Sequence, residues 1–287
     1  MGLRADRVAV VTGASRGAGK GIAEALGASG ATVYVTGRTL REGDAPLPGT
    51  VSSTAAAVTA AGGKGIAVAC DHADDAATRR LFEQVADEQG RLDILVNNAT
   101  CIPDALTDTG PFWEKPLELV DMLDVGLRSH YTASWFAAPL LLANGEGLIV
   151  NTSSFGGRIY MHGPAYGAGK AAVDKMAHDM AVDFRSHQVA VVSLWLGLLA
   201  TERTLRVFAA EPDKYAGMRD HTESPQFAGR VIDALARDPE LMARSGRVWV
   251  AAELAQHYGV LDTGGRQPAS PRLLFGEPTE FGDAVVE

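Results

Sequence analysis

A tyrosine and a lysine stand four residues apart in the segment Tyr166-Gly-Ala-Gly-Lys170, and the serine pair Ser153-Ser154 precedes them. On a helix, residues with this spacing lie on one face, about one turn apart. Free tyrosine has a pKa of about 10, and a neighbouring ammonium favours the phenolate and lowers that pKa. A serine hydroxyl can donate a hydrogen bond to an oxygen that gains negative charge. These residue types predict proton transfer at a carbonyl or alcohol, although the same spacing also describes an ordinary helix-surface pair.

Strand-like and helix-like segments alternate along the chain and would position these residues. Short apolar runs are expected as buried strands, at 8–12, 32–36, 65–70, 92–96, 147–152, 189–196 and 247–251. Helical patterns lie between them, at 17–29, 52–61, 74–89, 116–143, 165–186 and 224–237. Pro139 is expected to kink or end the fourth of these helices. The pattern predicts one α/β domain over 1–260, a Rossmann-type doubly wound parallel sheet of about seven strands with helices on both faces.

The bulk composition narrows the class of protein. The chain has 287 residues, of which 46% are hydrophobic and 21% charged, as in globular proteins. A net charge of −9 argues against a nucleic-acid partner. Its two cysteines have no ligand spacing, so neither a metal site nor a disulfide framework is expected. The start lacks the shape of a signal peptide, and no apolar run is long enough to span a membrane. We therefore expect a soluble, cytoplasmic protein.

A glycine-rich turn, Thr12-Gly-Ala-Ser-Arg-Gly-Ala-Gly19, joins the first strand to the first helix. Glycines at this place let the backbone approach a pyrophosphate, and the helix N-terminus offers free N–H groups and a positive dipole end. The turn predicts a dinucleotide site with contacts from Gly13, Ser15, Arg16, Gly17, Ala18 and Gly19.

The end of the second strand indicates which dinucleotide is bound. NAD usually requires an acidic residue there, but this strand ends in Thr36-Gly-Arg38. Arg16 and Arg38 are expected to clamp a 2′-phosphate, which favours NADP(H) over NAD(H); two solvated arginines are the alternative. Asp71, after the third strand, is expected to bind the adenine amino group or to cap the following helix.

In their order, the motifs resemble those of the short-chain dehydrogenase/reductase family. They are TGASRGAG, Asn97-Asn98-Ala99, Ser153-Ser154 and YGAGK. Local strings are similar to one branch, the bacterial counterparts of dehydrogenase/reductase family member one; they include GRLDILVNNA, VGLRSHY and SGRVWVAAELAQHYG. The resemblance runs from about residue 6 to 260 and implies the fold already predicted.

The resemblance also implies roles for the matching residues. Tyr166 would donate a proton to the substrate carbonyl, and Lys170 would lower the tyrosine pKa and hold the nicotinamide ribose. Ser154 would hydrogen-bond the substrate oxygen. Ser153 is the alternative, because only eleven residues separate Ser154 from Tyr166, one fewer than is common.

Three other residues would face the cofactor. Asn98 and Ala99 would lie beside it, with a strand-end cap as the alternative role of Asn98. Thr201, after the sixth strand, would bind the nicotinamide carboxamide or would only cap a helix.

Three departures from the family pattern bear on these roles. Thr100 replaces a glycine, and Leu196 replaces the proline of a rigid turn near the nicotinamide. Gly126 stands where the family has the asparagine that props open a helix bulge in its proton relay. The backbone freedom of glycine would permit the same bulge.

The loops at the carboxyl ends of the strands, 100–114, 155–164 and 197–222, should receive the substrate. Their apolar side chains suit an apolar or bulky carbonyl compound, and equally suit packing between loops or subunits; they are Ile102, Leu106, Phe112, Trp113, Phe155, Tyr160, Met161, Leu198, Leu199, Leu205 and Phe208. The extension 261–287 is expected to wrap a neighbouring subunit, to close part of the pocket or to be disordered.

The sequence predicts an NADP(H)-dependent enzyme that reduces a ketone or aldehyde by hydride transfer, with Tyr166 as proton donor. Two alternatives are a non-catalytic dinucleotide-binding sensor or scaffold and an NAD-dependent secondary-alcohol dehydrogenase. By resemblance, a homodimer or homotetramer is expected through the helices at 116–143 and 165–186.

Overall fold

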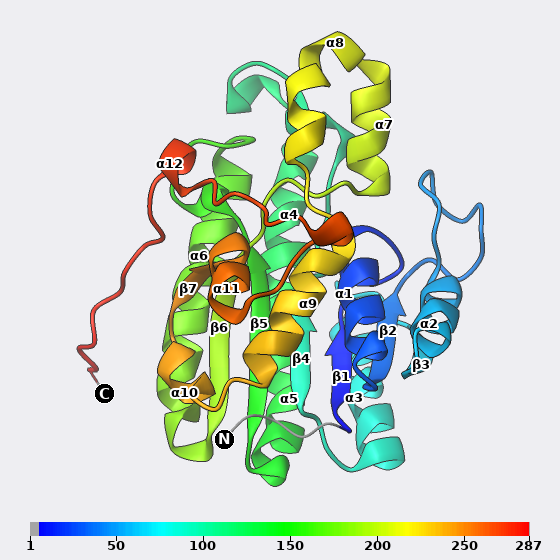
Figure 1. The fold of residues 1–287 in the computed structure, drawn as a ribbon, viewed down its shortest axis with the longest axis vertical. Coiled ribbons are helices and arrows are strands. Elements are labelled where there is room, and N and C mark those ends of the chain that lie inside the picture. Colours follow the sequence, from blue (N-terminus) through cyan, green and yellow to red (C-terminus); the bar gives the residue numbers. More distant parts are fainter. Residues whose placement is uncertain (1–5, 287) are drawn as a thin grey trace.

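The computed structural model describes residues 6–286 and contains one sheet of seven strands (Figure 1). Every neighbouring pair is parallel, and the strand order is β3-β2-β1-β4-β5-β6-β7. The strands are β1 Val8–Val11, β2 Thr32–Gly37, β3 Lys64–Ala69, β4 Ile94–Asn97, β5 Gly147–Ser153, β6 Val189–Trp195 and β7 Val248–Val250. The predicted Rossmann-type parallel sheet is confirmed. The prediction on a signal peptide concerns the start of the chain, where residues 1–5 lie outside the described part.

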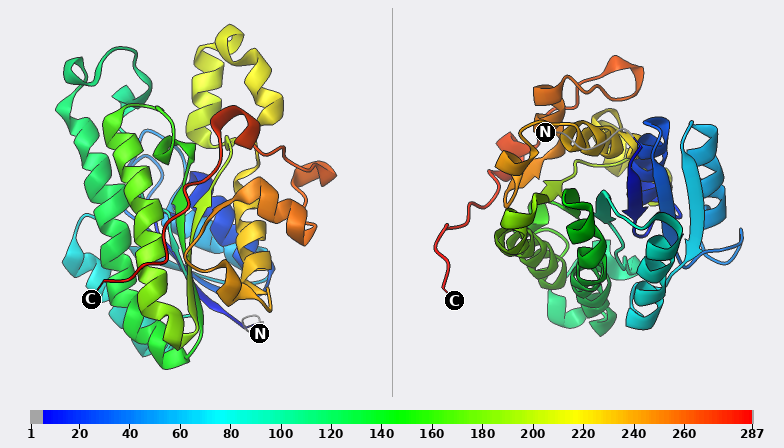
Figure 2. Two further views of the ribbon diagram at one scale, coloured as in Figure 1. Left: turned by 90° about the vertical axis from the view of Figure 1, so that its left-hand side faces the viewer. Right: turned by 90° about the horizontal axis from the view of Figure 1, so that it is seen from below.

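Helices cover both faces of this sheet (Figures 1 and 2). They are α1 Gly17–Ala28, α2 Val51–Ala60, α3 Asp75–Gln89, α4 Asp121–Leu123, α5 Ser129–Asn144, α6 Pro164–Phe184, α7 Glu202–Ala210, α8 Pro212–Tyr215, α9 Pro225–Ala236, α10 Leu241–Arg244, α11 Ala251–Tyr258 and α12 Arg272–Phe275. Within residues 6–286, no helix is both long and apolar enough to cross a membrane.

Alternate residues of β1 separate two hydrophobic cores. Ala9 and Val11 point to a core that α1, α2, α9 and α11 complete. Val8 and Val10 point to the other, which contains side chains of α3, α5 and α6. Successive side chains of a strand face opposite sides, so a strand buried on both sides reads as a continuous apolar run. For this reason the strands could be predicted from the sequence as apolar runs.

The carboxyl ends of the strands meet at the upper edge in Figure 1, beneath α7 and α8. Thr12 connects the two central strands there. Its Oγ accepts hydrogen bonds from the backbone N–H groups of Asn98 and Ala99, both at 2.9 Å. The strand order reverses between β1 and β4, so the Thr12 contacts hold the crevice in which such folds bind their ligands.

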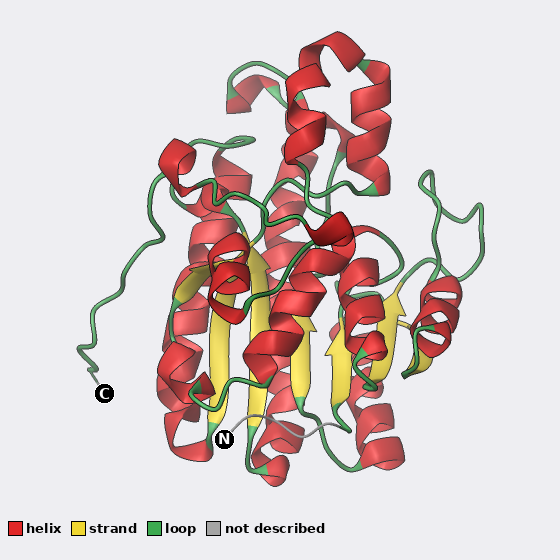
Figure 3. Ribbon diagram, viewed as in Figure 1, coloured by secondary structure: helices red, strands yellow, loops and turns green. Residues whose placement is uncertain are grey.

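Three segments differ from the prediction in their helices. The stretch expected as one helix at 116–143 consists of a 3₁₀ turn, the short α4, a π-type turn at Asp124–Arg128 and then α5. Pro139 lies inside α5, which continues to Asn144, so it does not end the helix. The segment 197–222, expected as a loop, contains α7 and α8 (Figure 3). Residues 251–258 also form a helix, α11, that was not predicted.

Helices α1 and α9 pack closely because α1 carries a glycine at the contact. A Cβ added to Gly21 would lie 2.1 Å from the carbonyl carbon of Pro225 and 2.3 Å from its oxygen. These are backbone atoms, which cannot rotate away as the end of a side chain can.

We predict that Gly21→Ala destabilises the protein. Alanine would favour the helix by about 1 kcal/mol, but overpacking against backbone costs about 1–3 kcal/mol or more, so the clash should prevail. Urea unfolding should show a lower free energy of unfolding. Gly217→Ala is the control, because its Cβ would meet nothing within 4 Å. Equal stability of Gly21→Ala and wild type would contradict the prediction.

Candidate active site

Ser154, Tyr166 and Lys170 lie together at the end of β5. Ser154 follows the strand directly, and Tyr166 lies in the first turn of α6. The hydroxyl groups of Ser154 and Tyr166 are 2.8 Å apart. Lys170 Nζ lies 5.9 Å from the centre of the Tyr166 ring and donates a hydrogen bond to the Thr152 carbonyl at 3.1 Å. Ser153 points elsewhere: it is buried, and its hydroxyl donates to the Lys170 carbonyl at 3.4 Å. The geometry therefore selects Ser154 as the serine beside the tyrosine.

The turn after β5 approaches α6 closely because it contains two glycines. A Cβ on Gly156 would lie 2.4 Å from the Tyr166 ring, and one on Gly157 would lie 3.0 Å from Ala171 N. The Gly156 N–H donates to Ser154 Oγ at 3.2 Å, which fixes the serine side chain in the same turn. Ser154 can reach Tyr166 because no side chain separates the turn from the helix.

Burial controls the pKa values at this site. It raises the pKa of the Tyr166 phenol, and the hydrogen bond from Ser154 opposes that shift. In this structure the removal of the Tyr166 hydroxyl from water prevails over the lowering of its pKa expected from Lys170, whose ammonium donates to the Thr152 carbonyl. Burial also lowers the pKa of Lys170 to about 8, while Asp174 opposes the change.

Asp174 is a buried carboxylate one turn beyond Lys170 on α6. It accepts hydrogen bonds from Ser193 Oγ at 2.6 Å and from Trp195 Nε1 at 2.9 Å, both on β6. Burial raises its pKa to about 6, and these hydrogen bonds lower it in part. The sequence analysis missed Asp174. Its spacing of four from Lys170 was the available signal.

The glycine turn forms a cradle that would admit a pyrophosphate. A Cβ on Gly13 would lie 2.7 Å from Ala99 Cα, and one on Gly19 would lie 2.4 Å from the Gly13 carbonyl oxygen. Asn98 Nδ2 donates to the carbonyl oxygens of Thr12 and Gly13, at 2.9 and 3.1 Å. Thus Asn98 caps the strand end and shapes the turn. The residues present fit a dinucleotide, since side chains are excluded from the surface on which it would lie.

The two arginines expected at the 2′-phosphate have different surroundings. Arg16 donates to the Pro48 and Gly49 carbonyls at 3.0 and 2.8 Å, and so it holds the loop after β2. Arg38 is exposed, and its guanidinium makes no hydrogen bond or ion pair within residues 6–286. Burial of Arg16 lowers its pKa, and neighbouring carboxylates oppose that shift. Arg38 is thus the cation with free donors at the end of β2.

Asp71 and Thr201 differ in their helix-capping roles. Asp71 Oδ1 accepts the Ala73 N–H at 3.1 Å in a turn before α3. The N-cap of α3 is Asp74, whose Oδ1 accepts the Ala76 N–H at 2.8 Å; a capping role for Asp71 is therefore wrong, because the helix starts later than expected. Thr201 does cap α7, accepting the Thr204 N–H at 3.2 Å.

Next to Thr201 is a contact that the sequence did not predict. The Gly17 N–H, at the start of α1, donates to Glu202 Oε2 at 2.8 Å. The two residues are far apart in the chain, so no local pattern could have revealed their contact.

The helix bulge expected at Gly126 is present. Val125 has non-helical dihedrals, and Gly126 has a φ of +144°, which L side chains rarely adopt. The Val125 carbonyl accepts the Cys101 N–H at 2.7 Å, and the Gly126 N–H donates to Ser129 Oγ at 3.1 Å. A Cβ on Gly126 would lie 3.1 Å from Thr100 Oγ. Glycine thus forms the bulge through its backbone.

Glu223 supports the turn after β6, where the family has a proline. Its carboxylate is buried and accepts the Gly197 N–H at 3.2 Å. A Cβ on Gly197 would lie 2.3 Å from Glu223 Oε1. Burial raises the pKa of Glu223 to about 7, and the Gly197 N–H opposes that rise. Sequence reasoning missed Glu223, because it lies between the predicted loop and the predicted helix.

The substrate side combines a buried wall with exposed apolar groups. Leu106, Leu119 and Met122 form a small core on which Ala165 and Tyr166 pack. Phe155 and Phe208 are buried, so they pack within the protein. The loops expected to receive the substrate also carry exposed apolar side chains, which include Ile102, Phe112, Trp113, Tyr160, Leu198 and Leu205.

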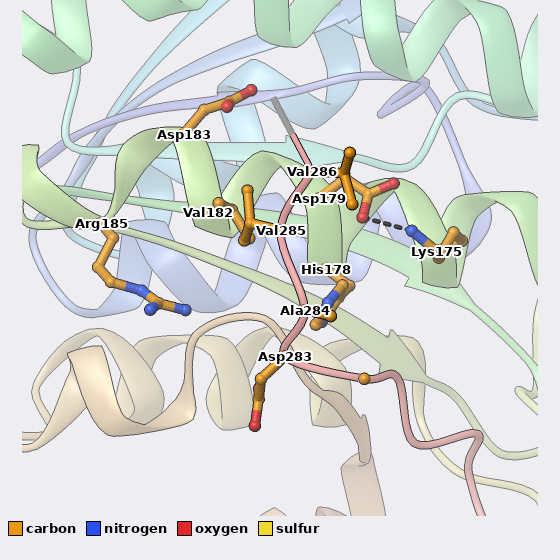
Figure 4. A pocket seen from close by; sticks show the side chains of 11 residues that line it. Lys175, His178, Asp179, Val182, Asp183, Arg185, Asp283, Ala284, Val285 and Val286 are labelled. Atoms are coloured by element: carbon orange, nitrogen blue, oxygen red, sulfur yellow. Dashed lines mark hydrogen bonds and ion pairs between the residues drawn. The ribbon is translucent and has the colours of Figure 1, made fainter.

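Part of the chain after α11 packs on α6 and on the turn that follows β5. Phe275 packs on Phe155, with ring centres 5.4 Å apart, and Phe281 packs on His178 at 5.2 Å. Residues 282–286 then follow α6 and enclose a hollow with Lys175, His178, Asp179, Val182, Asp183 and Arg185 (Figure 4). None of the predicted site residues lines this hollow, because it lies further along α6 than Tyr166 and Lys170.

A parallel sheet, a glycine cradle and adjoining Ser, Tyr and Lys side chains define a class, the Rossmann-type oxidoreductases. Residues 7–212 match the family described as short chain dehydrogenase. Dehydrogenase/reductase SDR family member 1 of Mus musculus is 43% identical over 271 residues, covering 91% of this chain and 84% of that protein. The Homo sapiens protein of the same name is 41% identical over equal coverage.

Solved structures agree with the sequence comparison. A short-chain type dehydrogenase/reductase from Mycobacterium marinum superimposes with a TM-score of 0.70 at 25% identity, covering 85% of this chain and 93% of that one. This chain therefore belongs to the short-chain dehydrogenase/reductase family and is an oxidoreductase. The predicted resemblance to family member one is confirmed. The family uses nicotinamide dinucleotide cofactors.

We predict that Glu223→Gln changes the pH dependence of stability. From pH 4.5 to about 7 the unfolded chain has lost a proton that folded Glu223 keeps, so this group lowers stability as the pH rises through that window. Across the whole window the loss of stability is on the order of 3 kcal/mol. Glutamine can still accept from Gly197 but does not titrate. The variant should gain stability relative to wild type between pH 5 and pH 8.

Urea unfolding at the two pH values measures this gain. Glu118→Gln, an exposed change of the same charge, is the control and should show no such gain. A difference between Glu223→Gln and wild type that is equal at both pH values would refute the prediction.

Proposed function

We propose that this protein is an NADP(H)-dependent reductase of apolar or bulky ketones and aldehydes. The observation that carries the proposal is the 2.8 Å contact between the hydroxyl groups of Ser154 and Tyr166, one turn from Lys170. Two hydroxyls at this distance can both donate a hydrogen bond to one carbonyl oxygen of a substrate that approaches them from the solvent side. The bound nicotinamide would supply the hydride.

The protein's own groups would perform the proton chemistry. Tyr166 gives its hydroxyl proton to the oxygen as negative charge develops, and Ser154 donates a hydrogen bond that stabilises the same oxygen. Lys170 places a positive charge beside the phenolate that Tyr166 becomes. Its depressed pKa, about 8, leaves the ammonium protonated at neutral pH. An intact Ser154–Tyr166 contact favours this enzyme over a non-catalytic dinucleotide sensor.

The preference for NADP(H) is supported by the free charge of Arg38. A 2′-phosphate at the end of β2 would meet that guanidinium, and no carboxylate at this strand end is available to bind a ribose hydroxyl. The apolar wall of Leu106, Leu119 and Met122 beside Tyr166 supports an apolar substrate. The proposal therefore differs from the alternative, an NAD-dependent alcohol dehydrogenase, both in the cofactor and in the direction of the reaction.

The same proposal includes a homodimer or homotetramer. Helix α5 exposes Tyr131, Trp135 and Leu142, large apolar side chains on one of the helices expected to pair. Clustered exposed groups of this kind are typical of association surfaces.

We predict that Tyr166→Phe lowers NADPH-dependent carbonyl reduction about 10²- to 10⁴-fold, because the proton donor is lost. NADPH affinity should stay within a few-fold of wild type. Turnover across a panel of apolar ketones and aldehydes measures the loss, and Tyr131→Phe, at an exposed tyrosine of α5 outside the substrate loops, is the matched control. Undiminished turnover in Tyr166→Phe would exclude the proposed role.

We predict that wild type binds NADPH more tightly than NADH and that Arg38→Ala removes most of this preference. A charge-assisted contact to phosphate contributes about 1.5–3 kcal/mol, roughly 10- to 100-fold in affinity. Separate titrations with NADPH and NADH measure the ratio. Arg41→Ala removes an equal charge from the adjoining exposed loop and should leave the ratio unchanged. Equal affinities in wild type would favour the NAD-dependent alternative.

A further inference from the structure

The first residue of α7 contacts the first residue of α1 across the cofactor cradle. Glu202 Oε2 accepts the Gly17 N–H at 2.8 Å. The two helix starts pack against each other there, since a Cβ on Gly17 would lie 3.6 Å from the Thr201 methyl carbon. A side chain of the segment 197–222 thus reaches the glycine turn.

This amide belongs to the part of the turn that the proposed function assigns to phosphate. The N-cap residue of α1, Arg16, makes no side-chain capping bond, and α1 has no acidic residue in its first turn. Unpaired N–H groups and the positive end of the helix dipole attract an anion. In this protein the Glu202 carboxylate supplies one.

A carboxylate and a phosphate cannot both occupy the Gly17 amide. The N–H group has a single proton to donate, and two negative groups a few ångströms apart repel each other. Phosphate binding on this turn therefore requires that Glu202 leaves Gly17.

We infer that Glu202 is a positioning residue that holds α7 on the start of α1 and that the dinucleotide phosphate displaces it. The inference rests on the proposed dinucleotide function. The displaced carboxylate has a second favourable place, because Glu202 lies in the first turn of α7 and can interact with the dipole of its own helix. When Glu202 leaves the start of α1, its carboxylate still lies at the start of α7, so the free-energy cost of the displacement is moderate.

The exchange couples two parts of the site. Thr201 caps α7 and precedes Glu202. At the other end of this stretch, the Gly197 N–H donates a hydrogen bond to Glu223. Release of Glu202 would detach the start of α7 from α1 only. Arg203 still donates to Asp104 at 2.9 Å and to the Ile102 carbonyl at 3.2 Å, and the Glu223 contact still holds the turn at Gly197. Cofactor binding would therefore reposition the helix that covers the site without detaching the whole segment.

The test compares NADPH dissociation constants of wild type, Glu202→Gln and Glu211→Gln, using the full chain and equilibrium titration. Glu211 is the C-cap residue of α7 and pairs with Lys214, so its variant removes an equal charge from the same segment away from α1. Glu202→Gln should bind NADPH about three- to tenfold more tightly, the size expected for loss of one charge-assisted contact at a partly exposed place. Glu211→Gln should stay within twofold of wild type.

Trypsin digestion without nucleotide provides a readout that does not depend on activity. Cleavage after Arg203 and Arg206 in α7 should be several-fold faster in Glu202→Gln than in wild type or Glu211→Gln, because the helix start is held less firmly. Two results would contradict the Glu202 inference and leave the proposed function standing. One is unchanged cleavage of Glu202→Gln, and the other is an NADPH affinity of Glu202→Gln that is equal to or weaker than that of wild type. If none of the three proteins binds a dinucleotide, the proposed function fails and the exchange fails with it.

Discussion

The close docking of α6 on the end of β5 is the constraint on which the site depends. Gly156 and Gly157 let the turn after β5 touch the helix, because a Cβ on either would collide with α6. The 3.6-residue period of the helix then places Tyr166, Lys170 and Asp174 on one side, facing the strand ends. If a side chain separated the turn from the helix, Ser154 would lose Tyr166 and Lys170 would lose the Thr152 carbonyl.

This docking also creates an electrostatic arrangement that a surface helix would lack. Burial lowers the pKa of Lys170 to about 8 and raises that of Asp174 to about 6, so both pKa values lie within about one unit of pH 7. Between these values both groups are charged, and each favours the charged form of the other. Asp174 is also fixed by hydrogen bonds from Ser193 and Trp195 on β6. The sheet therefore anchors the carboxylate that supports the lysine charge.

Local patterns allowed the sequence to predict much of the fold, and non-local contacts account for what it missed. Strands buried on both faces appear as apolar runs, and the Tyr166–Lys170 spacing is a property of one helix. By contrast, Glu202 reaches Gly17 through a fold-dependent contact. The tyrosine pKa shifts opposite to the prediction because depth of burial, unlike spacing, cannot be read from four adjacent residues. Helices α7 and α8 were missed because the whole segment 197–222 was expected as a loop at the carboxyl end of a strand, although Leu205 and Phe208 have helical spacing.

The departures from the family pattern are compensated by neighbours that complete the same structure. Gly126 removes a side chain that would have met Thr100, itself the residue in place of a glycine, and the helix bulge persists on backbone freedom. The turn at Leu196-Gly197 lacks proline, yet the Glu223 carboxylate holds it by hydrogen bonding to Gly197. The ring of a proline restricts a turn at every pH. The hydrogen bond from Gly197 to Glu223, by contrast, changes in strength when the carboxylate gains or loses its charge, and the pKa of Glu223 is about 7. In this protein a buried carboxylate therefore restrains the turn after β6, at the place where the family has a proline.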